Sequence, residues 1–113
     1  MSEHYKLHRV REMADGDEEF VAALAAAFIE EVPEDAERLR KAVPEGDFYE
    51  TYQAAHKMKP TIDLFELGVL EALIVVQDWG KNEEGEKDVT AQLQIVLAAV
   101  ENATNEIKSD YGL

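Results

Sequence analysis

The chain has 113 residues and no cysteine, and its 25 acidic and 11 basic side chains give a net charge of −14. The acidic excess argues against nucleic acid or an anionic membrane surface as a partner, since these are bound through basic patches, and the lack of cysteine excludes disulfides and thiolate chemistry. No apolar run approaches the ~20 residues of a membrane span and no signal peptide is recognisable, so we expect a cytoplasmic protein with a single domain over residues 1–113.

The first segment, residues 1–14, carries apolar side chains at a helix-like spacing. It predicts a short helix or a strap that lies across the rest of the fold. His4 and His8 are four residues apart, which on a helix is the spacing of a two-histidine metal site. Because no third ligand is in view, we interpret both as solvent-exposed histidines.

The next segment predicts a strong helix. Asp15 or Asp17 can cap its first turn, and residues 18–32 are rich in alanine with a wide apolar stripe. Pro33 is expected to bend or restart the helix, because proline suits a first turn, and residues 34–43 continue it.

A turn over residues 44–46 leads to a segment that reads as a helix from Asp47 to about Leu67. Asp47 can accept hydrogen bonds from the first turn and Glu50 can return one, as in a capping box. Apolar side chains then recur at steps of three and four. The predicted core face consists of Phe48, Tyr52, Ala55, Met58, Ile62 and Phe65. His56 falls at the edge of this face, so we expect its imidazole to be reachable from water.

Residues 69–79 form a fourth apolar segment, in which the run 73–76 has strand propensity. Helical neighbours favour a helix here, because a lone strand has nothing to pair with. Residues 80–87 predict a polar loop, and residues 88–109 a last helix with the apolar spacing of bundle packing. The sequence therefore predicts an all-α fold, an up-down antiparallel four-helix bundle preceded by the short N-terminal helix or strap.

Several features around His56 favour phosphoryl chemistry. Residues 51–62 contain no acidic side chain but include Lys57 and Lys59, so an incoming phosphoryl group meets a favourable field. Pro60 has no N–H to donate to the His56 carbonyl, so the helix should bend there and open space beside the imidazole. A neutral imidazole is nucleophilic near neutral pH, and a nearby lysine balances the new negative charge. We therefore interpret His56 as a phosphoryl carrier.

This stretch resembles the histidine phosphotransfer (HPt) domain of two-component phosphorelays. In that family a histidine is followed three positions later by a lysine, then by a small residue and usually a serine or threonine. The matching residues are His56, Lys59, Pro60 and Thr61, with further matches at Leu64, Leu67 and Gly68. The resemblance covers nearly the whole chain. Pro60 departs from it, because the family usually has glycine there.

The resemblance implies a reversible transfer of a phosphoryl group from a receiver-domain aspartate to Nε2 of His56, and from there to a second receiver. Lys59 would offset charge on the phosphoryl oxygens, and Lys57 would help or would contact the partner. Gln53 or Thr61 would hydrogen-bond the imidazole or the phosphate. The implied partners are response-regulator receiver domains and hybrid sensor histidine kinases, with this chain a monomer. No cofactor is implied for this chain, since Mg²⁺ belongs to the receiver's acidic pocket.

Two other functions are compatible with a helical bundle in general. An adaptor bundle that never takes phosphate and binds a signalling partner through its alanine-rich helix stays open. A di-metal carboxylate bundle fails on spacing, because no histidine has a glutamate three residues before it. Neither a glycine-rich phosphate loop nor a kinase signature is present, so the sequence predicts a phosphoryl carrier without an ATP site.

Overall fold

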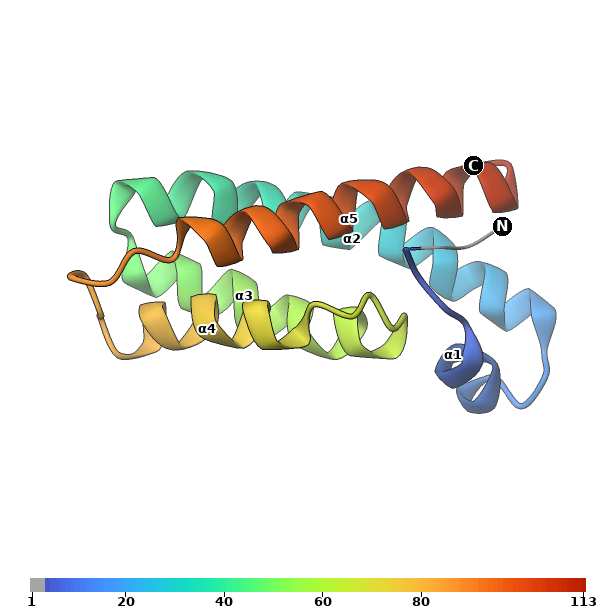
Figure 1. Ribbon diagram of the computed structural model, residues 1–113. Helices are drawn as coiled ribbons and strands as arrows, with labels where there is room; N and C mark the ends of the chain where they lie inside the picture. Colours follow the sequence, from blue (N-terminus) through green and yellow to red (C-terminus); the bar gives the residue numbers. More distant parts are fainter. Residues whose placement is uncertain (1–3) are drawn as a thin grey trace.

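The computed structural model describes residues 4–113, which form five α-helices and no strand. The helices are α1 (His8–Met13), α2 (Glu18–Glu45), α3 (Phe48–Leu64), α4 (Leu70–Lys81) and α5 (Thr90–Tyr111). The four longer helices lie lengthwise beside one another in an elongated molecule of 45 × 23 × 20 Å (Figure 1). α3 contacts α2 and α4, and α5 contacts the same two helices, so the four surround one hydrophobic core. The fold is all-helical, and this arrangement is compatible with a four-helix bundle.

Aspartates cap the two helices for which the sequence predicts them. The Asp17 carboxylate accepts hydrogen bonds from two backbone N–H groups in the first turn of α2, and Asp47 accepts one from the N–H of Glu50 at 3.1 Å. The returning half of the predicted capping box is wrong. The Asp47 N–H donates to the Ala42 carbonyl at 3.0 Å, and the Glu50 carboxylate binds Arg38 of α2. Glu50 therefore joins two helices instead of capping one.

Helix α2 is continuous over 28 residues and runs through Pro33 and Pro44, so the predicted restart at Pro33 and the turn over residues 44–46 are corrected. The helix ends where Gly46 takes the left-handed conformation, with φ of 68°. An interior proline costs a helix roughly 3 kcal/mol. Burying a valine or leucine side chain stabilises a fold by about 1.5–3 kcal/mol. Val32 and Leu39, on either side of Pro33, are both buried, so their burial offsets the cost of the proline.

The core face of α3 is turned slightly from the predicted one. Ala55, Met58, Ile62 and Phe65 are buried as predicted, and Thr51 and Ala54 are buried as well. Phe48 and Tyr52, in contrast, are only half-buried, because the face is displaced toward Thr51 and Ala54. The displacement brings Tyr52 to the margin of the solvent-exposed side of the helix.

Gly80 lies inside α4, so the loop that the sequence predicts from residue 80 begins too early. A Cβ at Gly80 would lie 2.7 Å from the Phe48 carbonyl oxygen and 2.8 Å from the Tyr52 backbone nitrogen. Only glycine allows α3 and α4 to approach so closely. Beside it, the Trp79 and Phe48 rings pack with centroids 4.7 Å apart, and the Trp79 indole N–H donates to the Lys87 carbonyl at 3.1 Å.

The remaining helical predictions agree with the structure, except that α3 ends at Leu64 and not at about Leu67. Residues 73–76 are helical within α4, where Leu73 and Val76 are fully buried, so the strand propensity of this run is overridden by its packing. The last helix spans Thr90–Tyr111, close to the predicted range of 88–109. No helix of the described residues combines the length and apolar character that crossing a membrane requires.

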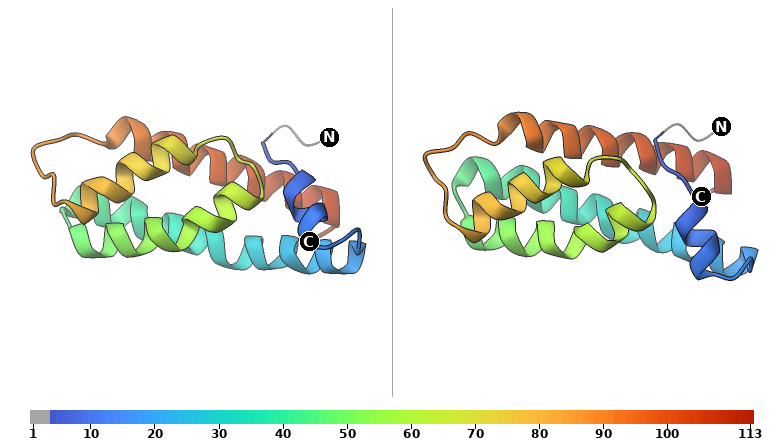
Figure 2. Two further views of the ribbon diagram at one scale, coloured as in Figure 1. Left: turned by 90° about the horizontal axis from the view of Figure 1, so that it is seen from below. Right: turned by 60° about the horizontal axis from the view of Figure 1, so that its bottom comes forward.

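Residues 4–13 lie across one end of the molecule, beside the ends of α2 and α5 that extend beyond α3 and α4 (Figure 2). Tyr5 is buried and its hydroxyl donates to Asp110 at 2.6 Å, and the Lys6 N–H donates to the Phe65 carbonyl at 2.9 Å. Val10 is the buried residue of α1. The segment thus forms a short helix and a strap, as predicted. Residues 1–3 of the prediction lie outside the described residues.

His4 and His8 do not share a helix face. His8 is the first residue of α1, whereas His4 precedes the helix and its Nδ1 pairs with the Glu106 carboxylate of α5. The spacing of four residues therefore does not place the two imidazoles as a metal pair. Among residues 4–113, no group of three or more histidine and carboxylate side chains is arranged to hold a metal ion.

Candidate functional site

His56 lies in the second half of α3 on its solvent-exposed side. At about 100° per residue, the side chains of Tyr49, Gln53, His56 and Pro60 fall within roughly 60° of one another around the helix. Tyr49 is 75% exposed, His56 and Pro60 are also exposed, and Gln53 is half-buried. The predicted accessibility of the imidazole is confirmed.

The nearest aromatic neighbour of the imidazole is Tyr52, one turn earlier on the same helix. The two ring centroids are 5.5 Å apart and the ring planes are inclined by 25°, which is a stacked arrangement. The sequence assigned Tyr52 to the core and missed this contact. Its signal is the i, i+4 spacing of Tyr52 and His56, because residues four apart on a helix are neighbours.

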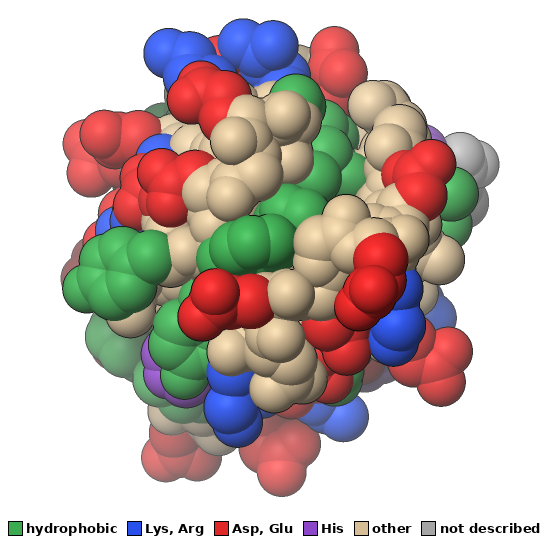
Figure 3. All heavy atoms as spheres, turned by 90° about the vertical axis from the view of Figure 1, so that its left-hand side faces the viewer, with side chains coloured by type: hydrophobic (Ala, Val, Ile, Leu, Met, Phe, Trp, Pro, Cys, Tyr) green, Lys and Arg blue, Asp and Glu red, His purple; other side chains and the backbone are tan. Residues whose placement is uncertain are grey.

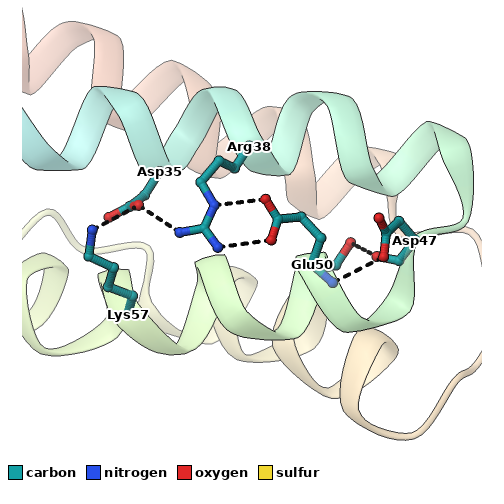
Figure 4. Close-up of polar contacts among 6 residues, drawn as sticks. Asp35, Arg38, Asp47, Glu50 and Lys57 are labelled. Carbon is teal, nitrogen blue, oxygen red and sulfur yellow. Dashed lines mark hydrogen bonds and ion pairs between the residues drawn. The ribbon is translucent and has the colours of Figure 1, made fainter.

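The two lysines beside His56 have different surroundings. The Lys57 ammonium lies 3.3 Å from Oδ1 of Asp35 on α2, so this side chain is held against the neighbouring helix (Figure 4). Lys59 is half-buried, and within residues 4–113 no carboxylate lies within ion-pair distance of its ammonium. Of the two predicted cations, only Lys59 has its charge uncompensated by a neighbouring side chain.

Asp35 belongs to a network of charged residues between α2 and α3. Arg38 donates to the same Asp35 oxygen at 3.1 Å and makes two hydrogen bonds to Glu50, from Nε at 2.8 Å and from Nη2 at 2.9 Å (Figure 4). Hydrogen bonding to Glu50 raises the pKa of Arg38, and the same contact lowers the pKa of Glu50 below its ordinary value. The network fixes α3 to α2 over the part of α3 that precedes and includes the His56 turn.

Asp35 and Arg38 are not among the site residues that the sequence predicts. The available signal is position, because Asp35 follows Val32 by three residues and precedes Leu39 by four, within the apolar stripe of α2. A carboxylate at such a position is expected to be buried and to need a cationic partner. The Asp35 side chain is indeed only 4% exposed.

The other predicted site residues lie at different angles from His56 around the axis of α3. Gln53 is one turn before His56, on the same side. Pro60 lies inside α3, whose helical assignment continues to Leu64, and is exposed one turn after His56. Thr61 is five residues after His56, which turns it about 140° away around the helix axis, and it is half-buried. The structure thus groups Gln53, His56 and Pro60, and separates Thr61 from them.

Tyr49, Tyr52 and Gln53 also line an open hollow between the start of α3 and the end of α4, which Gly80 and Lys81 close on the other side. Seen from the end of the molecule that carries the α2–α3 turn, hydrophobic side chains gather in the middle and acidic side chains are spread around them (Figure 3). Tyr52 therefore connects the hollow to His56, because it lines the hollow and its ring stacks on the imidazole.

Comparisons of the chain with protein-family models, with curated proteins and with solved structures give no match.

Proposed function

We propose that this chain is a histidine phosphotransfer protein of a two-component phosphorelay, in which His56 carries the phosphoryl group. The observation that carries the proposal is the pairing of an exposed imidazole with an uncompensated lysine one turn later, at His56 and Lys59. In this role the chain acts in the cytoplasm as a monomer that docks receiver domains, including those of hybrid sensor kinases.

The proposal includes an up-down antiparallel arrangement of α2, α3, α4 and α5. Two residues connect α2 to α3, and five connect α3 to α4. Connections this short favour antiparallel neighbours, and each successive pair of these helices is in contact. Such a bundle holds the histidine on a rigid convex surface, which suits docking to the concave active site of a receiver.

The chemistry needs little from this chain beyond a nucleophile in the right tautomer. Nε2 of a neutral imidazole attacks the phosphorus of an aspartyl phosphate with its lone pair, an N–P bond forms, and the P–O bond to the aspartate breaks. The carboxylate leaves with the bonding electrons, and the proton on Nδ1 stays on the ring. The reverse reaction passes the phosphoryl group to the carboxylate of a second receiver. Mg²⁺ in the receiver stabilises the charge that develops during transfer.

Lys59 is the residue of this chain that offsets the charge of the phosphoryl oxygens. Helical side chains lean toward the N-terminus of their helix, so the Lys59 side chain leans over the turn that carries His56. Lys57 is occupied by Asp35 and takes a structural part instead. Gln53 lies one turn before His56 on the same side of α3, from where its amide would donate a hydrogen bond to the imidazole or the phosphate, whereas Thr61 is turned away. Pro60 is compact and leaves the approach to His56 open.

The proposal is tested by acceptance of label. Purified protein is mixed with a receiver domain that carries radiolabelled aspartyl phosphate, with Mg²⁺ present, and label on this chain is measured. Transfer in an acid-labile, base-stable form that disappears in His56→Gln is the expected result. A folded protein that takes no label from a broad panel of receivers contradicts the proposal and favours the adaptor that binds its partner without phosphate.

A further inference from the structure

The ring of Tyr52 stacks against one face of the His56 imidazole. The ring centroids are 5.5 Å apart and the planes are inclined by 25°. The lone pair of Nε2 lies in the plane of the imidazole, so a ring packed on the face does not obstruct attack at the edge. His56 remains exposed in spite of the contact. The contact thus restricts the orientation of the imidazole without closing it to a partner.

Tyr52 is itself held by the packing of α3 against α4. Its backbone nitrogen lies so close to Gly80 that a Cβ on Gly80 would be 2.8 Å away, and its side chain is half-buried. Within residues 4–113 the Tyr52 hydroxyl makes no hydrogen bond to another protein group. The ring, and not the hydroxyl, therefore makes the contact with His56.

We infer that Tyr52 is a positioning residue for His56, whose ring fixes the imidazole with its Nε2 edge toward the phosphoryl donor. This inference rests on the proposed function for its use, but the contact itself can be tested in the free protein. Stacked aromatic pairs stabilise an orientation enough to change a rate by about two- to tenfold. Tyr52→Phe keeps the ring, whereas Tyr52→Leu and Tyr52→Met remove it.

The first test is the NMR signature of His56. In the wild-type protein and in Tyr52→Phe, the two carbon-bound ring protons of His56 are expected to be displaced by the ring current of residue 52. Both resonances should move toward their positions in an unstructured peptide in Tyr52→Leu and Tyr52→Met. Tyr49→Leu is the matched control, because Tyr49 lies on the same side of α3 but is 75% exposed. The two aliphatic variants are compared so that a folding defect in either one does not decide the result.

The second test uses phosphoramidate, which phosphorylates histidine without a receiver. Nε2 attacks the phosphorus of N-protonated phosphoramidate, the bond from phosphorus to nitrogen breaks, and neutral ammonia leaves with the bonding electrons while the proton on Nδ1 stays on the ring. Tyr52→Phe and Tyr49→Leu are expected to react at the wild-type rate, and the two aliphatic variants about two- to tenfold more slowly. The inference is overturned if the aliphatic variants keep both the wild-type rate and the wild-type His56 resonances. It is also overturned if Tyr52→Phe loses as much of the phosphorylation rate as the aliphatic variants do.

The two proposals fail in different experiments. If the Tyr52 variants behave as expected with phosphoramidate but no receiver transfers label, the carrier function is wrong and the positioning contact stands. If receivers transfer label to wild type and to both aliphatic variants at one rate, with the His56 resonances unchanged, the carrier function stands and the positioning role is wrong.

Discussion

The Asp35 carboxylate lies 3.3 Å from the Lys57 ammonium and joins α2 to α3 at the residue next to His56. The same carboxylate oxygen accepts a hydrogen bond from Arg38, and the side chain is only 4% exposed. A carboxylate so deeply buried needs cationic partners, since an unpaired buried charge is costly. The relationship separates the tasks of the two lysines near His56. Lys57 contributes to the helix contact, and Lys59, which has no carboxylate within ion-pair distance among residues 4–113, is the lysine that the proposed transfer would use.

Lys57→Ala should therefore affect mainly the stability of the protein, and Lys59→Ala mainly its rate of phosphoryl acceptance. Lys57→Ala should lower the free energy of unfolding by less than about 1 kcal/mol, because Arg38 still compensates Asp35 and the lysine is half exposed. Its rate of phosphoryl acceptance should stay near wild type. Lys59→Ala should leave stability unchanged and slow acceptance by about tenfold, since a charge-assisted contact in the transition state is lost. Urea unfolding and label transfer measure the two effects, and a slower acceptance in Lys57→Ala alone would contradict the assignment.

Arg38→Ala should destabilise the protein by roughly 1–3 kcal/mol, because Asp35 stays buried with one partner fewer and Glu50 loses both of its hydrogen bonds. Arg40→Ala is the matched control. Arg40 pairs with Glu37 and both side chains lie on the exposed face of α2, so its loss should leave the free energy of unfolding nearly unchanged. Equal effects in the two variants would mean that the Asp35 network contributes nothing to the α2–α3 contact.

The lowered pKa of Glu50 predicts a pH dependence. Its hydrogen bonds with Arg38 favour the charged carboxylate in the folded protein, so the pKa lies below the ordinary value of 4.5. The stabilisation is fully present above that ordinary value and is lost as the pH falls through the lower, folded-state value. Glu50→Gln should therefore be less stable than wild type near neutral pH, and the difference should shrink in acid. Urea midpoints across the acidic range measure it, and a gap that stays constant with pH would contradict this role for Glu50.

Gly80→Ala should destabilise the protein by about 1–3 kcal/mol, because the added Cβ would meet backbone atoms of Phe48 and Tyr52 at 2.7 and 2.8 Å. Gly85→Ala is a milder control. Its Cβ would meet only the far end of the Phe48 ring at 3.1 Å, where the side chain can shift. The midpoints of thermal unfolding compare the two, and a Gly80→Ala protein as stable as Gly85→Ala would mean that α3 and α4 are less closely packed than the structure shows.

Much of the helical framework follows from local signals in the sequence. The apolar spacing of residues 18–32 and 88–109 predicts the two long helices, and Asp47 caps α3 as its position indicates. The exposure of His56 also follows from its phase on α3. These properties depend on neighbours three or four residues away, which the sequence displays directly.

The predictions that are wrong concern packing between segments that are distant in the chain. Pro33 does not end α2, because the buried residues on either side stabilise the continuous helix. Gly80 is a residue type typical of loops, but it lies inside α4 and allows α4 to pack closely against α3. The sequence does not show which of the two lysines is paired, because only the register of α2 against α3 places the Asp35 carboxylate beside Lys57. Tyr52 was misassigned because a small rotation of the core face of α3 moved it from the core to the side of His56.

The carrier role is tested most directly by passing the phosphoryl group on. The protein is charged with radiolabel, purified, and mixed with an unphosphorylated receiver and Mg²⁺, and the label on both proteins is followed over time. The account predicts that label leaves His56 and appears on the receiver much faster than it is lost to water, and that His56→Gln, folded as well as wild type, never acquires label. Label that stays on the chain with every receiver until it hydrolyses, or that is acquired equally well by His56→Gln, would contradict the account.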